Sequence, residues 1–139
     1  ERHIDEGFAL VRELLVEALQ ETPPAELLLR RFVVAMVALH ESEPGLHRVL
    51  FEEVPLPASV RRGLRRRENE FAMEVCGLLE AHPEVRMKEP RVTAYVLVHT
   101  VDALVHNFVL HPPKDIETEE LTDEVVRMLL RHLLVDESS

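Results

Sequence analysis

The chain has 139 residues, of which 46 % are hydrophobic and 30 % are charged, and its formal net charge is −10. This composition is typical of a globular protein and excludes a disordered chain. The acidic balance disfavours direct binding to nucleic-acid phosphates, and the longest uncharged apolar run is too short for a membrane span.

The first half of the chain predicts three helices. Apolar residues recur at helical spacing over 3–20 and predict the first one. Thr22, which precedes two prolines, is expected to end that helix and to cap a second one over 24–41. This second helix is rich in apolar residues, so we expect it to be deeply buried. A break then precedes a short helix over 46–53, and two prolines in 54–57 predict a stiff turn.

The second half predicts three longer helices. Residues 58–81 form an amphipathic pattern, and an arginine-rich run over 61–67 lies mostly off its apolar stripe. His82-Pro83 ends this helix, a central helix follows over 89–111, and the last helix is expected over 119–135. No segment favours a strand, so the sequence predicts an all-α fold of six helices in one domain that covers the whole chain.

The central helix is apolar nearly all round, and we therefore expect it to be buried on several sides. Its polar residues fall in rows, and His99, Asp102 and His106 stand at i, i+3 and i+7 on one face. A central helix with two packing faces and a polar line is a natural place for a binding site.

The last two helices carry more apolar surface than one chain of this size can cover. An antiparallel helix pair with a surplus apolar face is how a two-fold four-helix interface is built. We therefore predict a homodimer through a four-helix bundle made by residues 89–111 and 119–135. The residues expected at this interface are Val101, Leu104, Val105, Phe108, Leu121, Val125, Met128, Leu129 and His132.

Several segments, together with helix order, helix lengths and turn positions, carry a resemblance to a known family. They are ERHIDEGFALVRELL at the start, PGLHRVLFEEVP in the middle, then EPRVTAYVLVHTVDALVHNFVL and LTDEVVRMLLRHLL. The chain resembles the C-terminal regulatory domain of the tetracycline-repressor (TetR) family of bacterial transcription regulators. The helix-turn-helix domain of that family is absent from these residues, and we expect it to lie before Glu1.

The resemblance implies a cytoplasmic regulatory domain that is not an enzyme. Family members bind DNA as dimers and release it when a small molecule enters a cavity in this domain. Here DNA would be bound only through the absent domain, the effector would be small and largely apolar, and no cofactor or membrane partner is expected. The residues expected to line the cavity are Phe32, Met36, His40, Phe71, Val75, Cys76, Tyr95, His99 and Asp102.

The line of His99, Asp102 and His106 has three interpretations. The first is structural, with a buried imidazole bonded to a carboxylate or to a backbone carbonyl. The second is contact with a ligand in the pocket. The third is a metal site, which geometry disfavours because the two histidines are about 10 Å apart along a helix. A stand-alone helical bundle with a metal or redox role through these residues is the alternative function, and a purely structural dimerisation module is a third.

No catalytic constellation is visible. Cys76 is the only thiol, so no internal disulfide is possible, and a reducing compartment fits. Glu68 lies at the edge of its helix's apolar stripe, where it could pair with an arginine or meet a cationic ligand. The arginine run is most simply a solvated face. From the resemblance we hypothesise that the short helix 46–53 and the turn after it pass cavity changes to the absent domain.

Overall fold

The computed structural model describes residues 23–42 and 57–134, together with positions 9, 12, 13, 16, 17, 20 and 21. Over these residues it defines α2 (Ala25–Ser42), α4 (Ala58–Glu80), α5 (Pro90–Leu110) and α6 (Thr118–Leu134). The described residues contain no strand. The prediction of an all-α fold is therefore confirmed for the described residues. The predicted ranges of the four long helices that follow residue 23 are also confirmed to within about one residue at each end. The helix predicted over 3–20 lies mostly outside the described residues, and the one over 46–53 lies wholly outside them.

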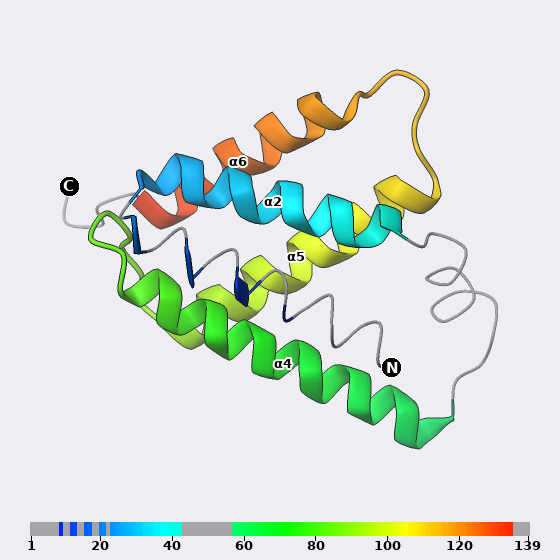
Figure 1. Ribbon diagram of the computed structural model, residues 1–139, viewed down its shortest axis with the longest axis horizontal. Coiled ribbons are helices and arrows are strands. Elements are labelled where there is room, and N and C mark those ends of the chain that lie inside the picture. The colour runs from blue at the N-terminus through cyan, green and yellow to red at the C-terminus, as the bar shows by residue number, and fades with distance from the viewer. Residues whose placement is uncertain are drawn as a thin grey trace.

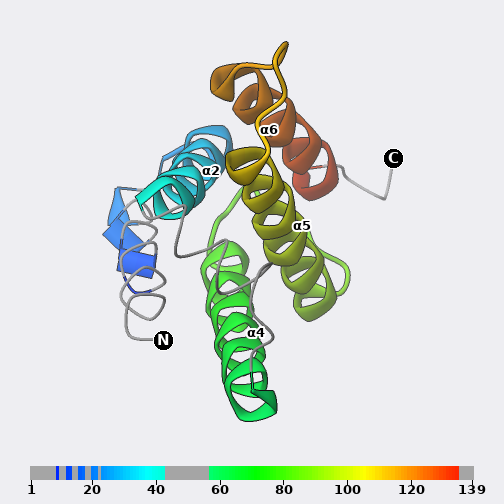
Figure 2. The same cartoon turned by 90° about the vertical axis from the view of Figure 1, so that its right-hand side faces the viewer.

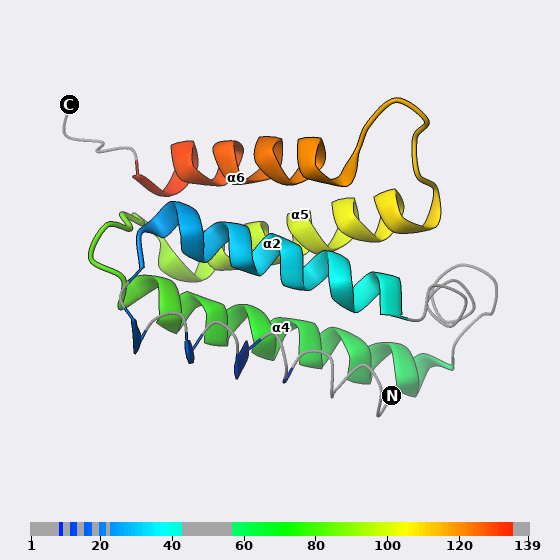
Figure 3. The same ribbon diagram turned by 45° about the horizontal axis from the view of Figure 1, so that its top comes forward.

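The four helices run roughly alongside one another with alternating directions (Figures 1 and 3). α2 packs against both α5 and α6, and α4 packs against α5. α2 and α5 point one way along the bundle, whereas α4 and α6 point the other way (Figure 1). Seen end-on, the order runs from α6 past α2 and α5 to α4 (Figure 2). α2 and α5 thus hold the central positions.

The helix ends follow local chemistry. Pro90 occupies the first turn of α5, where its missing N–H costs no hydrogen bond. Before α6, the backbone N–H of Glu117 donates to the Oε1 atom of Glu120 at 2.9 Å, and acidic residues in this turn suit the helix dipole. At the other end of α6, the carbonyl of Leu133 accepts a bond from the backbone N–H of Arg86 at 2.7 Å. This contact ties the α4–α5 turn to the end of α6.

The turn after α4 also holds the start of α2. His82 is 2 % exposed, and its Nε2 atom lies 2.8 Å from the carbonyl oxygen of Pro23. Its Nδ1 atom accepts a bond from the backbone N–H of Glu84 at 3.1 Å. The Oε1 atom of Glu84 in turn accepts the backbone N–H of Ala25 at 3.0 Å. Because Nδ1 accepts, Nε2 carries the hydrogen, and both nitrogens of this buried ring are satisfied.

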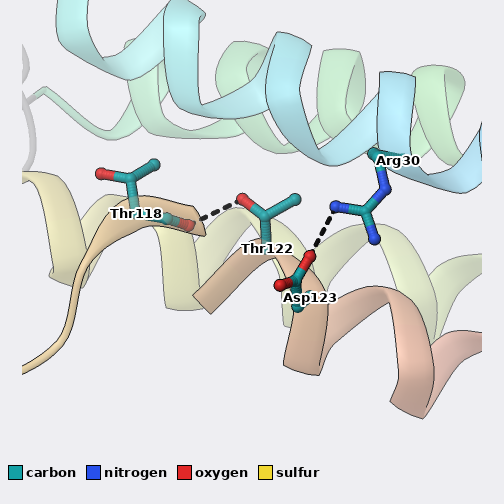
Figure 4. Close-up of polar contacts among 4 residues, drawn as sticks. All are labelled: Arg30, Thr118, Thr122 and Asp123. Carbon is teal, nitrogen blue, oxygen red and sulfur yellow. Dashed lines mark hydrogen bonds and ion pairs between the residues drawn. The ribbon is translucent and has the colours of Figure 1, made fainter. Parts of the chain in front are cut away.

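A polar seam joins α2 to α6 at the surface (Figure 4). The Nη1 atom of Arg30 lies 2.7 Å from the Oδ1 atom of Asp123, and both side chains are more than a third exposed. Next to it, the hydroxyl of the buried Thr122 donates to the carbonyl oxygen of Thr118 at 2.9 Å. A buried hydroxyl without a partner would be costly, and this bond removes that cost.

A single apolar core runs between the four helices. α2 contributes Phe32, Val33 and Met36, and α4 contributes Phe71 and Val75 among others. The largest side chains with less than 2 % exposure are Met36, Leu133, Val33, Val101, Val105 and Val126. Two of these come from the middle of α5, so the inner side of that helix lies at the centre of the core.

The burial of the helices differs in part from the expectation. α5 packs against both α2 and α4, as expected of a helix buried on several sides, but Val92, Tyr95 and Val96 are each more than half exposed. Among the described helices only α2 and α4 pack closely on α5, which leaves its third side uncovered. Along α2, Val34 is 53 % exposed within the run expected to be deeply buried. On α6, Met128 and His132, which were predicted at the dimer interface, are both exposed.

Candidate functional site

A polar pair lies inside the bundle where the end of α2 meets α5. The Nδ1 atom of His40 is 2.8 Å from the carbonyl oxygen of Met36, and its Nε2 atom is 3.3 Å from the Oδ1 atom of Asp102. A carbonyl oxygen only accepts, so Nδ1 carries a hydrogen. The contact between Nε2 and the carboxyl group then needs a second hydrogen, on one partner or the other. The pair of His40 and Asp102 is therefore neutral overall.

The charge on His40 reflects opposing effects. Burial disfavours the charged imidazolium, whereas the hydrogen bonds to Asp102 and to the Met36 carbonyl, and the charge of Asp102, favour it. The balance raises the pKa of His40 above its ordinary 6.5. We therefore describe the pair as an imidazolium facing a carboxylate. The ring of His106 meets the His40 ring edge-on, with 5.7 Å between the centroids.

A second polar contact links α4 to α5. The Oε2 atom of Glu68 is 3.9 Å from the Nδ1 atom of His99, which is too long for a hydrogen bond. Burial raises the pKa of Glu68, the charge of Asp102 raises it further, and Arg65 opposes both effects. The Nε2 atom of His99 is buried and has no hydrogen-bond partner. Such atoms are rare in folded proteins because each one forfeits its hydration without compensation.

The apolar residues predicted to line a cavity from α2 and α4 lie in the core. Phe32 and Met36 of α2 and Phe71 and Val75 of α4 are all buried. The rings of Phe32 and Phe71 are stacked, with 6.5 Å between their centroids. Tyr95 differs, because it is 52 % exposed and lies on the outer side of α5 with its ring 4.2 Å from that of His99. Tyr95, the aromatic residue of α5 that was predicted to line the cavity, thus lies at the surface of the bundle.

An apolar cavity of about 20 Å³ lies between α2, α4 and α5. This is room for about one water-sized probe, whereas ligand pockets usually measure about 300–1,000 Å³. A molecule of ordinary effector size would need these helices to move apart at this place. The residues that line the cavity are Leu28, Leu29, Phe32, Val75, Leu78, Leu79 and Leu97.

Cys76 does not have the environment of a reactive thiol. It is 2 % exposed, and its Sγ atom donates to the Oε1 atom of Glu80 at 3.2 Å along the same helix. Burial, the hydrogen bond to Glu80 and the charge of Glu80 raise the pKa of the thiol. A high pKa keeps the sulfur protonated and unreactive.

The residues predicted at the dimer interface divide between two environments. Leu104, Met128 and His132 are exposed, and Phe108 and Leu121 are half-buried, so all of these could meet a partner. The other predicted interface residues already lie in the core of the single chain, where the other helices cover them. They are Val101, Val105, Val125 and Leu129. A dimer contact on α5 and α6 would therefore involve the exposed residues around Tyr95 and Met128, rather than the predicted residues that lie in the core.

The predicted line of His99, Asp102 and His106 is not assembled as a single site. Asp102 pairs with His40 of α2, and His99 faces Glu68 of α4. Among the described residues, no group of three or more histidine, cysteine, aspartate or glutamate side chains is arranged to hold a metal ion. The structure thus joins Asp102 and His106 to α2 through His40, and His99 to α4 through Glu68.

Sequence reasoning missed the part played by His82 and Glu84. His82 was used only as a helix stop, yet both of its ring nitrogens are engaged and it holds the start of α2. The sequence signal that could have indicated this role is a histidine followed by a proline in the turn between two apolar helices. Glu68 was noted as a residue at the edge of a stripe that could pair with an arginine; its Oε2 atom lies 3.9 Å from His99 Nδ1, and the charge of Arg65 also acts on it.

The arginine run lies on the outer side of α4. It borders an open groove together with polar residues of the next turn, and these side chains are mostly exposed. The groove is lined by Arg62, Arg65, Arg66, Asn69, Glu70 and Met73. The mixture of charges fits a solvated helix face.

By length and composition alone α5 is apolar enough to cross a membrane, contrary to what the uncharged runs suggested. The core helix of a water-soluble protein passes the same test. α5 carries Asp102 and two histidines and packs against α2 and α4.

Comparison with known proteins gives one family match. A family model described as "Tetracyclin repressor-like, C-terminal domain" matches residues 23–133. That range contains α2, α4, α5 and all but the last residue of α6, together with the polar pairs and the exposed side of α5. Comparisons with curated proteins and with solved structures found no match.

Proposed function

The chain belongs to the tetracycline repressor-like C-terminal domain family, and from this premise we propose that it is the effector-binding and dimerisation domain of a cytoplasmic bacterial transcription regulator. The whole chain would form this one domain, without enzymatic activity. DNA would be bound by a helix-turn-helix segment outside these residues. A small molecule bound within the helices would change the affinity for DNA.

The observation that carries the proposal is a set of buried and half-buried polar groups in an otherwise apolar bundle. His40, Glu68, His99 and Asp102 come from three helices and form two pairs, each of which joins α5 to a neighbouring helix. A ligand site is mostly apolar with a few fixed polar groups, and this is that combination. A solid structural module would gain more from apolar residues at these positions, because polar groups are costly to bury.

The exposed apolar side of α5 supports a homodimer. Val92, Tyr95 and Val96 are each more than half exposed, and Met128 of α6 is 45 % exposed. Contiguous exposed apolar surface on a folded chain marks an interaction site. A second copy related by a two-fold axis would cover both helices at once in an antiparallel four-helix contact.

In this proposal the ligand acts by separating α2 from α4. α5 is held to α2 by the pair of His40 and Asp102, and it is also the helix that would contact the partner chain. A shift of α4 relative to α5 would therefore alter both the pocket and the dimer geometry. Helix shifts at subunit interfaces are a common allosteric transition, with coupling free energies of about 1–3 kcal/mol.

The test uses the longer protein that includes the DNA-binding segment. Compounds that raise the melting temperature of that protein are identified first, and their effect on its affinity for operator DNA is then measured. The proposal expects at least one stabilising compound to change operator affinity by about 5- to 150-fold. Stabilising compounds that leave operator affinity unchanged would overturn the proposal.

The transmission hypothesis has its own test in the same protein. Pro55 lies outside the described residues, in the predicted stiff turn. Pro55→Ala is expected to alter the response of DNA binding to effector while leaving effector affinity nearly unchanged. An unaltered response would rule out this turn as the connection.

A further inference from the structure

One end of the bundle is fastened by a joint between the turn after α4 and the start of α2. Pro23 and Pro24 have no backbone N–H, so the N–H of Ala25, which is 1 % exposed, is the first donor of this segment. It donates to the Oε1 atom of Glu84 at 3.0 Å, and a carboxylate suits the positive end of a helix dipole. His82 completes the joint, since its Nε2 atom donates to the carbonyl oxygen of Pro23 at 2.8 Å. The start of α2 is thus held by a turn that lies 59 residues further along the chain.

The joint also reaches the last helix. From the same turn, the backbone N–H of Arg86 donates to the carbonyl oxygen of Leu133 at 2.7 Å. The start of α2 and the end of α6 are therefore both bonded to the turn between α4 and α5. Each bond ends on a main-chain atom, so it fixes the position of the turn while it allows the helix before the turn to rotate about that position. Hinges in proteins are built from a few residues in loops or at the ends of elements, as here.

The two halves of α4 are anchored differently. The side chains that α4 contributes to the core of the described residues all lie in its second half, and they are Phe71, Ala72, Val75 and Leu79. Of residues 58–66, only Gly63 and Leu64 are buried. α2 and α4 lie near each other where α2 begins and diverge toward the opposite end of the bundle (Figures 1 and 2). The first half of α4 therefore extends as a lever from the anchored half.

The small apolar cavity lies beside the joint. Two of its lining residues are Leu28 and Leu79, which are three residues from Ala25 and from His82 respectively. On the far side of the cavity α5 is held to α2, because Asp102 pairs with the buried His40. Of the three helices around the cavity, α4 is thus the one whose movement leaves this pair intact.

We propose that His82 and Glu84 form a hinge about which α4 swings away from α2, so that the space between the two helices opens at the end opposite the joint. This inference rests on the effector-binding function proposed above and adds the pivot about which the site opens. Both are positioning residues, which hold the turn in place while the first half of α4 moves. At 1.5 Å per residue, Arg62 lies about 30 Å from His82 along the helix and Gly77 about 8 Å, so the swing displaces Arg62 about four times as far.

The experiment measures distances between α2 and α4 at two places in the 139-residue protein without ligand. Spin labels are attached to cysteines introduced at exposed positions, and double electron–electron resonance gives the distribution of distances between them. The near pair is Glu26→Cys with Gly77→Cys, and Gly77 has room for a side chain. The far pair is Ala38→Cys with Arg62→Cys. Cys76 is 2 % exposed and should stay unlabelled, which the parent chain verifies.

The parent is expected to give a wider distribution for the far pair than for the near pair, because displacement grows with distance from the pivot. Glu84→Ala removes the acceptor of the Ala25 N–H, and His82→Ala removes both bonds of the ring. Each should raise the population of longer near-pair distances by about 2- to 10-fold, the equivalent of one hydrogen bond. Glu84→Gln keeps an acceptor oxygen and should give the parental near-pair distribution. Circular dichroism melting shows that the variants are folded, and Glu84 is the exposed position of the two.

The outcomes separate this proposal from the previous one. A far-pair distribution as narrow as the near-pair distribution in the parent would overturn the swing of α4. A near-pair distribution that neither alanine variant changes would overturn the joint as the pivot, and so would a Glu84→Gln variant that behaves like Glu84→Ala. All of these measurements are made without ligand, so the function proposed above is decided separately by its operator-binding test.

Discussion

The two sides of α5 have similar composition and very different surroundings. The inner side carries Ala94, Val101 and Val105, each with 0 % exposure, and the outer side carries Val92 and Val96, each more than half exposed. Valine stands on both sides, so residue type does not distinguish them. The difference is that α2 and α4 cover one side and no described helix covers the other.

The polar residues of α5 follow the same division. Asp102 and His99 are on the covered side, and each has a partner group from another helix. The inner side is thus packed against α2 and α4 within one chain, and Asp102 pairs there with His40. The exposed apolar residues of the outer side would be buried only by contact with another molecule, such as a second copy of the chain. The predictions below test whether these two sides contribute to different properties, folding on one side and assembly on the other.

The largest difference is expected between two matched substitutions. Val101→Asp places an unpaired carboxylate at a site with 0 % exposure and should prevent stable folding, since such burial costs several kcal/mol against a total of about 5–15 kcal/mol. Val96→Asp, on the outer side, should leave a folded chain that no longer dimerises. Circular dichroism melting and sedimentation velocity measure the two properties. A dimeric Val96→Asp variant would contradict the proposed interface.

An intermediate effect is expected for the polar pair on the inner side. Asp102→Ala leaves the buried His40 without its carboxylate partner and should lower the free energy of unfolding by about 1.5–3 kcal/mol, the range for hydrogen bonds to charged groups. Glu70→Ala, at an exposed position in the middle of α4, is the control and should change stability by less than about 0.5 kcal/mol. Urea unfolding measures both. Equal losses would mean that the pair contributes nothing specific.

The same pair predicts a direction of pH dependence. The pKa of His40 is raised in the folded state, so folding favours its proton, and this stabilisation is complete below the ordinary pKa of 6.5. It is lost as the pH rises through the higher folded-state pKa. His40→Gln keeps a donor but does not titrate, so its stability should fall less between pH 6.5 and the alkaline side of that transition. A steeper fall of stability in His40→Gln than in the parent would contradict the assignment that folding raises the pKa of His40.

Glu68 adds a contribution of the same sign at lower pH. Its folded-state pKa is raised above 4.5, so the folded chain again holds its proton more tightly than the unfolded chain. Stability from this group is present below pH 4.5 and is lost as the pH rises through the raised value. Glu68→Gln should therefore lose less stability than the parent over that interval in the same urea measurements.

The boundaries of the four long helices could be predicted because the signals are local. His82-Pro83 and Pro112-Pro113 stop helices wherever the chain goes next, and Pro90 suits a first turn. These rules depend on neighbouring residues only. The prediction of an all-α fold needed nothing more.

The sequence did not allow us to predict which face of each helix packs against the rest of its own chain. A helix that is apolar nearly all round has no pattern to say which side meets its own chain, so Val101 and Val125 were assigned to a partner although they lie in the core. The pairing of His40 with Asp102 depends on how α2 packs across α5, which no local rule specifies. His40 and Asp102 were nevertheless both placed in the candidate site, since buried polar residues stand out in apolar helices.

The smallest effect is expected at the surface seam between α2 and α6 (Figure 4). Arg30 and Asp123 approach to 2.7 Å, but their side chains are 38 % and 54 % exposed, so water and salt screen the pair. A double-mutant cycle of Arg30→Ala and Asp123→Ala should give a coupling energy of about 0.2–1 kcal/mol that shrinks at high ionic strength. The pair of Arg127 and Glu124, within α6 alone, is a matched control and should give about 0.3–0.5 kcal/mol. A coupling above about 1.5 kcal/mol at Arg30 and Asp123 would mean that the outer surface stabilises the fold as the inner side does, and the division between the two would fail.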